Sequence, residues 1–200
     1  MTLTQTIKKF LTGDNNRPII VGLGNPGRQY ERTRHNIGRE IVTSLASHDW
    51  RSEAVGRRLV QAGEIGDQAV TFVLPNDFMN RSGPAIKPFL SRSKLSSVIV
   101  VYDDMDLPWG KVKISNNRGD GGHRGLKSII DTAGSKNFAR LRIGISKPES
   151  KQVGSDFVLT SFTPAESKLK PKIIASAHQA LEKIITIGLT KAMTEVNQAD

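Results

Sequence analysis

The sequence predicts a single α/β domain, with a mixed, largely parallel, twisted sheet flanked by helices. Along its 200 residues, apolar segments of strand length alternate with segments whose apolar residues recur at helical spacing. The chain has no internal repeats or low-complexity linkers, and its length suits one domain with a sizeable core. We expect this domain over residues 19–193, with a leader over 1–18 and a C-terminal tail over 194–200.

The first elements are a strand, a helix and a hairpin. Residues 18–23 are apolar and end in a Gly/Asn/Pro turn, which is typical of a buried strand. Apolar residues at helical spacing over 37–45 predict a helix. Two strands, 57–65 and 69–74, are separated by a Gly-Asp turn and predict a hairpin.

Three more strands are expected in the second half. The most apolar strand, 98–102, is followed by Asp103 and Asp104, at which we expect it to end. Residues 111–115 alternate as in a half-exposed strand, and 141–145 form another alternating strand.

Three further helices are expected between and after these strands. Ser82 is a suitable N-cap for a helix over 83–92, and the glycine-rich segment 119–125 leads into another helix. A long helix is expected over 164–188, where Pro171 either kinks the helix or marks its start.

The charge is large, positive and unevenly distributed. The net charge is +10, and between Trp109 and Lys151 there are ten lysines and arginines against three acidic residues. This concentration indicates an anionic partner, of which nucleic acid is the commonest kind. The lack of cysteine excludes disulfides, a thiol nucleophile and cysteine-ligated metals.

The N-terminal segment has no secretory apolar core, and the chain has no apolar run long enough to span a membrane. Lys8 and Lys9 precede the first acidic residue, Asp14, in a segment that weakly resembles an organellar transit peptide. We expect a soluble intracellular protein without a membrane segment. The leader favours the mitochondrion slightly, and bacterial cytoplasm is the alternative.

Residues 22–27, GLGNPG, satisfy the G-x-G-x-x-G pattern of dinucleotide-binding loops directly after a strand. Pro26 removes a backbone N–H that should face a pyrophosphate, and residues 28–36 are almost wholly polar where a packed helix should begin. No acidic residue stands at the end of a clear second strand to bind the ribose. We therefore expect no nicotinamide cofactor.

His35 lies at the expected start of a helix, where the helix dipole disfavours the imidazolium and helps keep the ring neutral. A catalytic base also needs a partner that fixes its tautomer. Asp103 is a suitable partner because it follows an apolar strand, as Asn25 does, and ligands bind beyond such strand ends. Asp104 and Asp106 are alternatives that the sequence does not eliminate.

Three other segments carry polar groups that suit a site. The acidic run 103–106, with His35 and His123, could hold a divalent metal, although no motif with metal-ligand spacing is present. Asn80 could hold a carbonyl group or a water. The segment 119–127 is glycine-rich and basic at a helix start, which suits phosphate or ribose.

In this order, these segments resemble the bacterial-type peptidyl-tRNA hydrolase family, whose members cleave the ester between a peptide and the 3′-terminal ribose of tRNA. The resemblance extends from about residue 19 to 193 and rests on VGLGNPGRQYERTRHNIG, PNDFMNRSG, VYDDMDLPWGKVKI, GGHRGLKSI and LRIGISKP, with FVLTSF and GLTKAM near the end.

The resemblance implies that His35 activates water and that Asp103 orients it, without a metal, a cofactor or a covalent intermediate. It implies that Asn25 and Asn80 hold the peptide end and the carbonyl group. We further expect substrate contacts from Tyr30, Phe78, His123 and Arg124, the last two in a gate-like loop. Expected tRNA contacts are Lys113, Lys127 and Arg142.

Arg124 departs from the family, which usually has asparagine in this Gly-His-Asn-Gly motif. Because arginine cannot accept a hydrogen bond, our hypothesis is that it contacts a phosphate instead. The expected partner is peptidyl-tRNA, and the protein is expected to be a monomer. The alternative function is that of a non-catalytic RNA-binding protein, similar to a splicing factor on the same fold.

Overall fold

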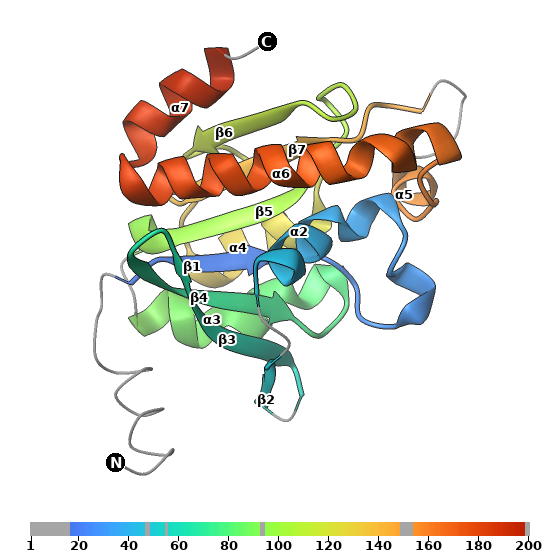
Figure 1. Ribbon diagram of the computed structural model, residues 1–200. Helices are drawn as coiled ribbons and strands as arrows, with labels where there is room; N and C mark the ends of the chain where they lie inside the picture. Colours follow the sequence, from blue (N-terminus) through green and yellow to red (C-terminus); the bar gives the residue numbers. More distant parts are fainter. Residues whose placement is uncertain (1–16, 47–48, 55, 93–94, 149–153, 199–200) are drawn as a thin grey trace.

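A seven-stranded sheet with the order β2-β3-β4-β1-β5-β7-β6 forms the middle of the fold (Figure 1). The computed structural model describes residues 17–46, 49–54, 56–92, 95–148 and 154–198. The strands are β1 (Ile19–Gly22), β2 (Arg51–Glu53), β3 (Arg58–Ile65), β4 (Gln68–Pro75), β5 (Val98–Asp104), β6 (Val112–Asn116) and β7 (Ala139–Gly144). The helices are α2 (Ile37–Leu45), α3 (Ser82–Arg92), α4 (Arg124–Ala133), α5 (Gly154–Phe157), α6 (Pro164–Thr186) and α7 (Leu189–Gln198).

The four central strands, β4, β1, β5 and β7, are parallel to one another, and the strands outside them pair antiparallel. Three of the six strand pairs are therefore parallel, which confirms a mixed sheet with a parallel centre. Because parallel strands end on the same side, β1 and β5 deliver the residues that follow them to one edge of the sheet.

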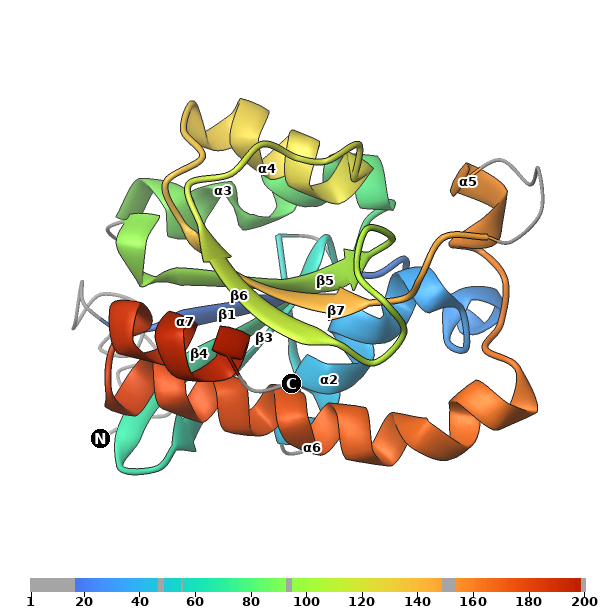
Figure 2. The ribbon, with the colours of Figure 1, turned by 90° about the horizontal axis from the view of Figure 1, so that it is seen from above.

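Helices cover both faces of the sheet, α3 and α4 on one face and α2, α6 and α7 on the other (Figure 2). Successive residues of a strand point to opposite faces, so β5 serves both layers. Val98 and Val100 pack into the apolar cluster of the α3/α4 side, whereas Ile99 and Val101 pack into that of the α2/α6 side. A strand buried on both faces is uniformly apolar, which explains the run that predicted it.

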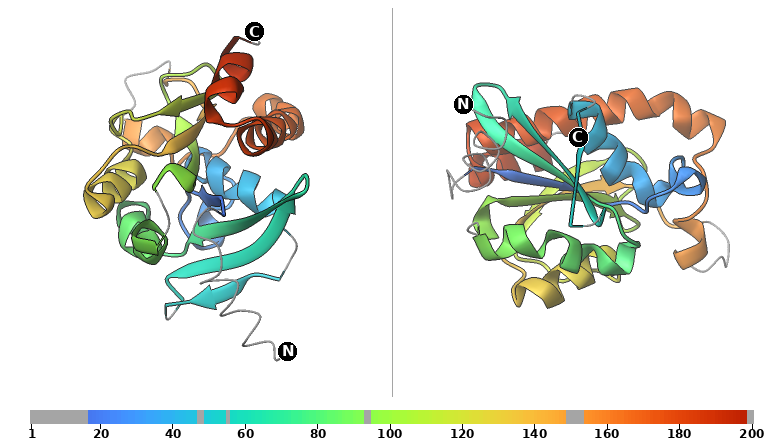
Figure 3. Two further views of the ribbon diagram at one scale, coloured as in Figure 1. Left: turned by 90° about the vertical axis from the view of Figure 1, so that its left-hand side faces the viewer. Right: turned by 90° about the horizontal axis from the view of Figure 1, so that it is seen from below.

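The strand and helix assignments agree with the sequence for most elements, and the views in Figure 3 show the hairpin of β3 and β4 at one side of the sheet. The predicted N-cap was wrong. Ser82 is the first residue of α3 itself, and its hydroxyl donates to the carbonyl of Met79 at 2.8 Å. A short 3-10 helix, η3 (Met79–Arg81), leads directly into α3, so this serine does not cap a helix end.

Two strand expectations also need correction. Asp103 and Asp104 belong to β5, because both residues still pair with β7, opposite Ile143 and Gly144. The residues of β7 are buried throughout, including Arg140, because β7 lies inside the sheet between β5 and β6 and helices cover both of its faces.

The long helix and the chain end differ in detail from the prediction. Helix α6 begins at Pro164 after a capping box of Thr163 and Glu166, so Pro171 lies inside it and does not mark its start. Helix α7 extends across the expected boundary at residue 193, and Asn197 forms two hydrogen bonds with the backbone of Ile114 on the edge strand β6. The leader expected over 1–18 falls almost wholly outside the described residues.

No helix in the described part of the chain combines the length and the apolar character needed to cross a membrane.

Gly38 lets α2 approach the sheet. A Cβ atom at this position would overlap the backbone carbonyl of Val101, which has no room to move in the middle of β5. We expect Gly38→Ala to lower the free energy of unfolding by about 1–3 kcal/mol, as overpacking does in other cores. Urea denaturation measures this change. Gly119→Ala is the control, because its added Cβ would meet nothing within 4 Å. Equal stability of the two variants would contradict the proposed close contact.

Candidate active site

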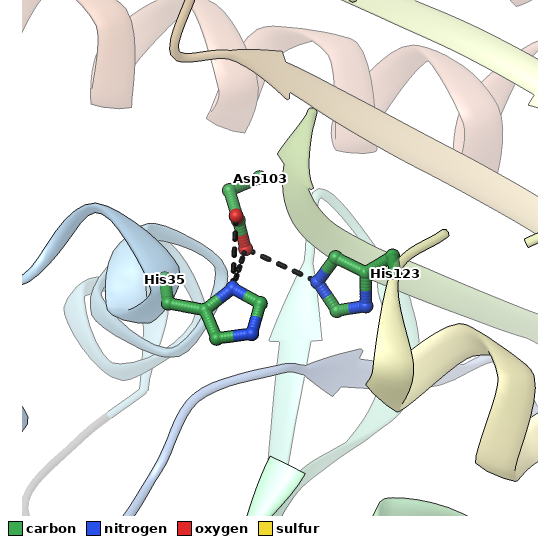
Figure 4. A group of neighbouring side chains, drawn as sticks. All are labelled: His35, Asp103 and His123. Carbon is green, nitrogen blue, oxygen red and sulfur yellow. Dashed lines mark hydrogen bonds and ion pairs between the residues drawn. The ribbon is translucent and has the colours of Figure 1, made fainter. Parts of the chain in front are cut away.

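His35 and Asp103, the pair expected from the sequence, are in contact at the end of the parallel sheet. His35 lies in the 3-10 helix η2 (Arg34–Asn36), and Asp103 is the sixth residue of β5. The Nδ1 atom of His35 is 2.9 Å from each carboxylate oxygen of Asp103 (Figure 4). Because a carboxylate only accepts, the geometry requires Nδ1 to carry the proton and leaves Nε2 as the basic nitrogen.

A second histidine binds the same carboxylate. The Nε2 atom of His123 is 3.2 Å from Oδ1 of Asp103, while its Nδ1 accepts hydrogen bonds from the backbone N–H groups of Gly125 and Leu126. His123 thus caps the N-terminus of α4 with one nitrogen and donates to Asp103 with the other. The sequence placed this residue in the loop beside the site but did not reveal its bond to Asp103.

Asp103 is 3% exposed and is held as a carboxylate by these two rings. Burial alone would raise the pKa of its side chain, but the electrostatic effect and hydrogen bonds of His35 and His123 outweigh burial and hold this pKa well below the usual range. The carboxylate therefore stays charged at neutral pH and keeps accepting from both rings.

The other two acidic candidates have separate partners. Asp104 accepts from Nε of Arg142 at 2.8 Å and from the hydroxyl of Tyr102 at 3.3 Å. Asp106 is exposed and pairs with Lys147 at 2.9 Å. The geometry therefore selects Asp103 as the partner of His35.

His35, Asp103 and His123 also form a group whose ligand atoms lie within 4.8 Å of one another. Such a group is the minimum for a metal site. Each imidazole already donates an N–H to the carboxylate, and the backbone of α4 occupies the remaining nitrogen of His123. An ion would have to replace both of these hydrogen bonds, so the arrangement fits a proton-transfer site better than a ligand set.

Asn25 is buried and tightly oriented. Its side-chain oxygen accepts from the backbone N–H of Met79 at 2.8 Å, and its own backbone N–H and carbonyl bind the side chain of Asn36. Because the side-chain oxygen is occupied, the amino group of Asn25 is the end of the amide that can donate to a ligand. The sequence did not identify Asn36, which holds the loop after β1 in this shape.

The loop over residues 22–27 does not lead directly into an α-helix, as a dinucleotide-binding loop would. The short 3-10 helix η1 (Arg28–Tyr30) follows it, and α2 begins only at Ile37.

The candidate residues surround a cavity of about 540 Å³. Asn25, His35, Asp103, His123 and Arg124 contribute to its wall, together with Phe78 and Asn80 from the segment after β4. The wall also includes apolar residues that the sequence had not indicated, namely Met79, Met105, Val158 and Leu159. Tyr30 is half-buried and is not part of the described cavity wall.

The three expected tRNA contacts occupy different environments. Lys113 and Arg142 are opposite each other on β6 and β7, but Arg142 is buried in its ion pair with Asp104. Lys127 is exposed on α4, where it pairs with Asp131 one helical turn later at 2.9 Å. All three therefore lie on β6, β7 or α4.

The peptidyl-tRNA hydrolase family model matches residues 19–200 of this chain. The chain belongs to this family. A peptidyl-tRNA hydrolase of Aquifex aeolicus is 41% identical over 188 residues, which cover 91% of this chain and 97% of the relative. That of Carboxydothermus hydrogenoformans is 42% identical, with 90% and 98% covered. The crystal structure of the Acinetobacter baumannii enzyme superimposes with a TM-score of 0.83 at 32% identity, and covers 92% of this chain and 96% of its own.

Family membership confirms the resemblance that the motifs carried. The named relatives are bacterial and are named as hydrolases, so they give no support to the mitochondrial preference or to a non-catalytic RNA-binding protein.

The hydrogen bonds at Asp103 fix a different tautomer on each ring. We expect the neutral form of His35 to carry its proton on Nδ1 and that of His123 on Nε2, because each N–H must face the same carboxylate. Long-range proton–nitrogen NMR spectra of the imidazole rings distinguish the two forms. Identical tautomers on both residues would contradict this arrangement.

Proposed function

We propose that this chain hydrolyses the ester bond between a peptide and the 3′-terminal ribose of tRNA, with His35 as the general base. The observation that carries the proposal is the Nδ1–H bond of His35 to a buried carboxylate, which leaves Nε2 free to take a proton beside the cavity. Membership of the peptidyl-tRNA hydrolase family supplies the substrate class.

In the proposed mechanism, Nε2 of His35 takes a proton from a water molecule as the water oxygen attacks the ester carbonyl. The ionised Asp103 stabilises the imidazolium that forms. When the carbon–oxygen bond to the ribose breaks, the imidazolium returns the proton to the leaving oxygen, and the products are a free peptide acid and tRNA. Asn25 and Asn80 both line the cavity, which supports a role for their amides in holding the carbonyl group and the peptide.

The positive charge of the chain supports a nucleic-acid substrate. Lys127 lies on α4, which begins at the cavity wall, and Lys113 and Arg142 lie on β6 and β7, so we propose that the tRNA acceptor end approaches over these three elements. Phe78, 56% exposed at the cavity rim, offers an aromatic face to the terminal base or the peptide. We further propose that the protein acts as a monomer and is located in bacterial cytoplasm.

The first test is release of tRNA from peptidyl-tRNA in the presence of a strong chelator. We expect the wild-type protein to be active under these conditions and His35→Ala to lose about 10²–10⁴-fold in kcat, because base catalysis typically contributes that much. Binding of tRNA should change little, since Nε2 is needed for chemistry and not for phosphate contacts.

The matching change at the carboxylate is Asp103→Asn, which keeps the shape but removes the negative charge and replaces one accepting oxygen with a donating amino group. We expect it to reduce kcat more than Asp104→Asn does, because Asp104 pairs with Arg142 and does not touch His35. Full turnover by His35→Ala, or activity that disappears with chelator, would rule out the proposed mechanism.

Arg124 allows a test of the phosphate contact. It is exposed on the cavity wall at the start of α4. We expect Arg124→Asn to weaken tRNA binding and to reduce the slope of log affinity against log salt concentration by about one, as for one lost phosphate contact. Lys172→Asn is the control because it removes the same charge from an exposed position on α6, across the sheet from α4. An unchanged slope for Arg124→Asn would refute the contact.

A further inference from the structure

The side chain of Arg34, the residue before the catalytic base, is buried in a dense set of contacts. Its two terminal nitrogens bind the two carboxylate oxygens of Glu166, each at 2.7 Å, and its Nε donates to the hydroxyl of Thr160 at 3.2 Å. Its guanidinium lies over the rings of Phe157 and Phe162, at 4.6 and 5.0 Å from their centroids. Only 6% of the Arg34 side chain is exposed. A bidentate, charge-assisted pair of this geometry belongs to the strong class of hydrogen bonds.

The backbone makes parallel connections at the same place. The N–H of Arg34 donates to the carbonyl of Thr160 at 3.0 Å, and the N–H of His35 donates to the carbonyl of Val158 at 2.8 Å. Thr33 forms an isolated β-bridge with Ser161. The segment between α5 and α6 therefore lies along η2 like a short strand, as Figure 2 shows to the side of the sheet.

This segment also forms part of the site. Val158 and Leu159 line the cavity, as do His123 and Arg124. The same backbone contacts thus fix both the catalytic base and one wall of the cavity.

Glu166 joins this assembly to the long helix. It is the third residue of α6, where its carboxylate accepts from the N–H of Thr163 at 2.7 Å and completes the capping box. The hydrogen bonds from Arg34, partly opposed by burial and supported by those of Thr163, hold the pKa of Glu166 at about 2. The carboxylate is therefore charged at every pH at which the enzyme would act.

We infer that Arg34 and Glu166 are positioning residues of the active site: their ion pair sets the orientation of His35 and places the 158–161 segment as a wall of the substrate cavity. The inference rests on the proposed function for its kinetic part. Among the described residues that line the cavity, neither Arg34 nor Glu166 is present. Both therefore act through His35 and through the segment between α5 and α6.

The position of the base matters because a displacement of about 1 Å can reduce a rate on the order of 100-fold. Asp103 holds only the ring of His35, at Nδ1, and cannot fix the backbone that carries the ring. Two consecutive backbone bonds and the Arg34 side chain supply that second support. Loss of Glu166 also leaves the guanidinium of Arg34 buried without a counter-charge, which is costly.

The test compares Glu166→Gln and Arg34→Lys with the wild-type protein in the peptidyl-tRNA assay. Arg34→Lys keeps the charge but cannot form the bidentate pair. We expect kcat to fall about 10–100-fold in Glu166→Gln and less in Arg34→Lys, with KM changed much less than kcat. In the NMR spectrum, the Nδ1–H signal of His35 should broaden or exchange faster with water in both variants, while the Nε2–H signal of His123 should stay unchanged.

Two controls separate positioning from helix stability. Glu40→Gln removes the 2.7 Å ion pair between Glu40 of α2 and Lys170 of the same helix α6, and in the described structure these two side chains form no hydrogen bond with those of Arg34 or Glu166. Thr163→Ala removes the hydroxyl of the α6 capping box but leaves the Arg34–Glu166 pair intact. We expect both controls to lower thermal stability while kcat and the His35 signal stay close to those of the wild type.

Stability against pH gives a further check on the pair. A carboxyl with a lowered folded-state pKa stabilises the fold above its unfolded pKa and loses that contribution as the pH falls toward the folded value. The stability difference between the wild type and Glu166→Gln should therefore shrink between about pH 4.5 and pH 2.

The inference fails if folded Glu166→Gln and Arg34→Lys both keep the wild-type kcat and the wild-type His35 signal, or if Glu40→Gln reduces kcat as much as they do. Failure of the proposed function has a different result, in which the wild-type protein itself releases no tRNA. In that case the NMR comparison still decides whether the pair orients His35.

Discussion

The site depends on one buried carboxylate that accepts hydrogen bonds from two imidazoles. A charge with 3% exposure is unfavourable unless it is paired and fully hydrogen-bonded, and the two histidines meet that requirement for Asp103. The consequence for each ring is different. His123 has its other nitrogen bound to the backbone of α4, so it is fully used in holding the carboxylate and the helix. His35 has its other nitrogen beside the cavity, so only this ring can exchange a proton with a ligand.

The topology explains why these groups meet. Strands β1 and β5 are adjacent and parallel, so the loop containing Asn25 and the carboxylate of Asp103 emerge at the same edge. Gly38 brings α2 against the backbone of β5, which places the preceding η2 beside the end of that strand. His35 and Asp103 are 68 residues apart in the sequence, but Nδ1 of His35 lies 2.9 Å from the carboxylate of Asp103. A change in the packing of α2 against β5 would therefore displace His35.

Much of this arrangement could be predicted from the sequence because the responsible residues lie at recognisable boundaries. Asn25 follows an apolar strand, Asp103 lies near the end of another, and His35 lies just before a helix. The bond of His123 to Asp103 could not be predicted, because it depends on how the glycine-rich loop folds back onto the sheet. The capping rule failed at Ser82 for a related reason: residue type suggested a helix boundary, but the preceding 3-10 turn had already begun the helical path. Helix α7 was missed since its stability comes from contacts with α6 and β6.

The pair of Arg34 and Glu166 could not be predicted from local sequence patterns. The two residues are 132 positions apart, and each has an ordinary local interpretation, a basic residue in a polar stretch and the acidic member of a capping box. Only the folded chain reveals that Glu166, which completes the capping box of α6, also neutralises the residue before His35. A single carboxylate thus links the packing of the longest helix to the geometry of the site. The carboxylate of Asp103 binds the ring of His35, whereas that of Glu166 binds the side chain of the preceding residue, so the two carboxylates act on different groups. For that reason, neither can substitute for the other.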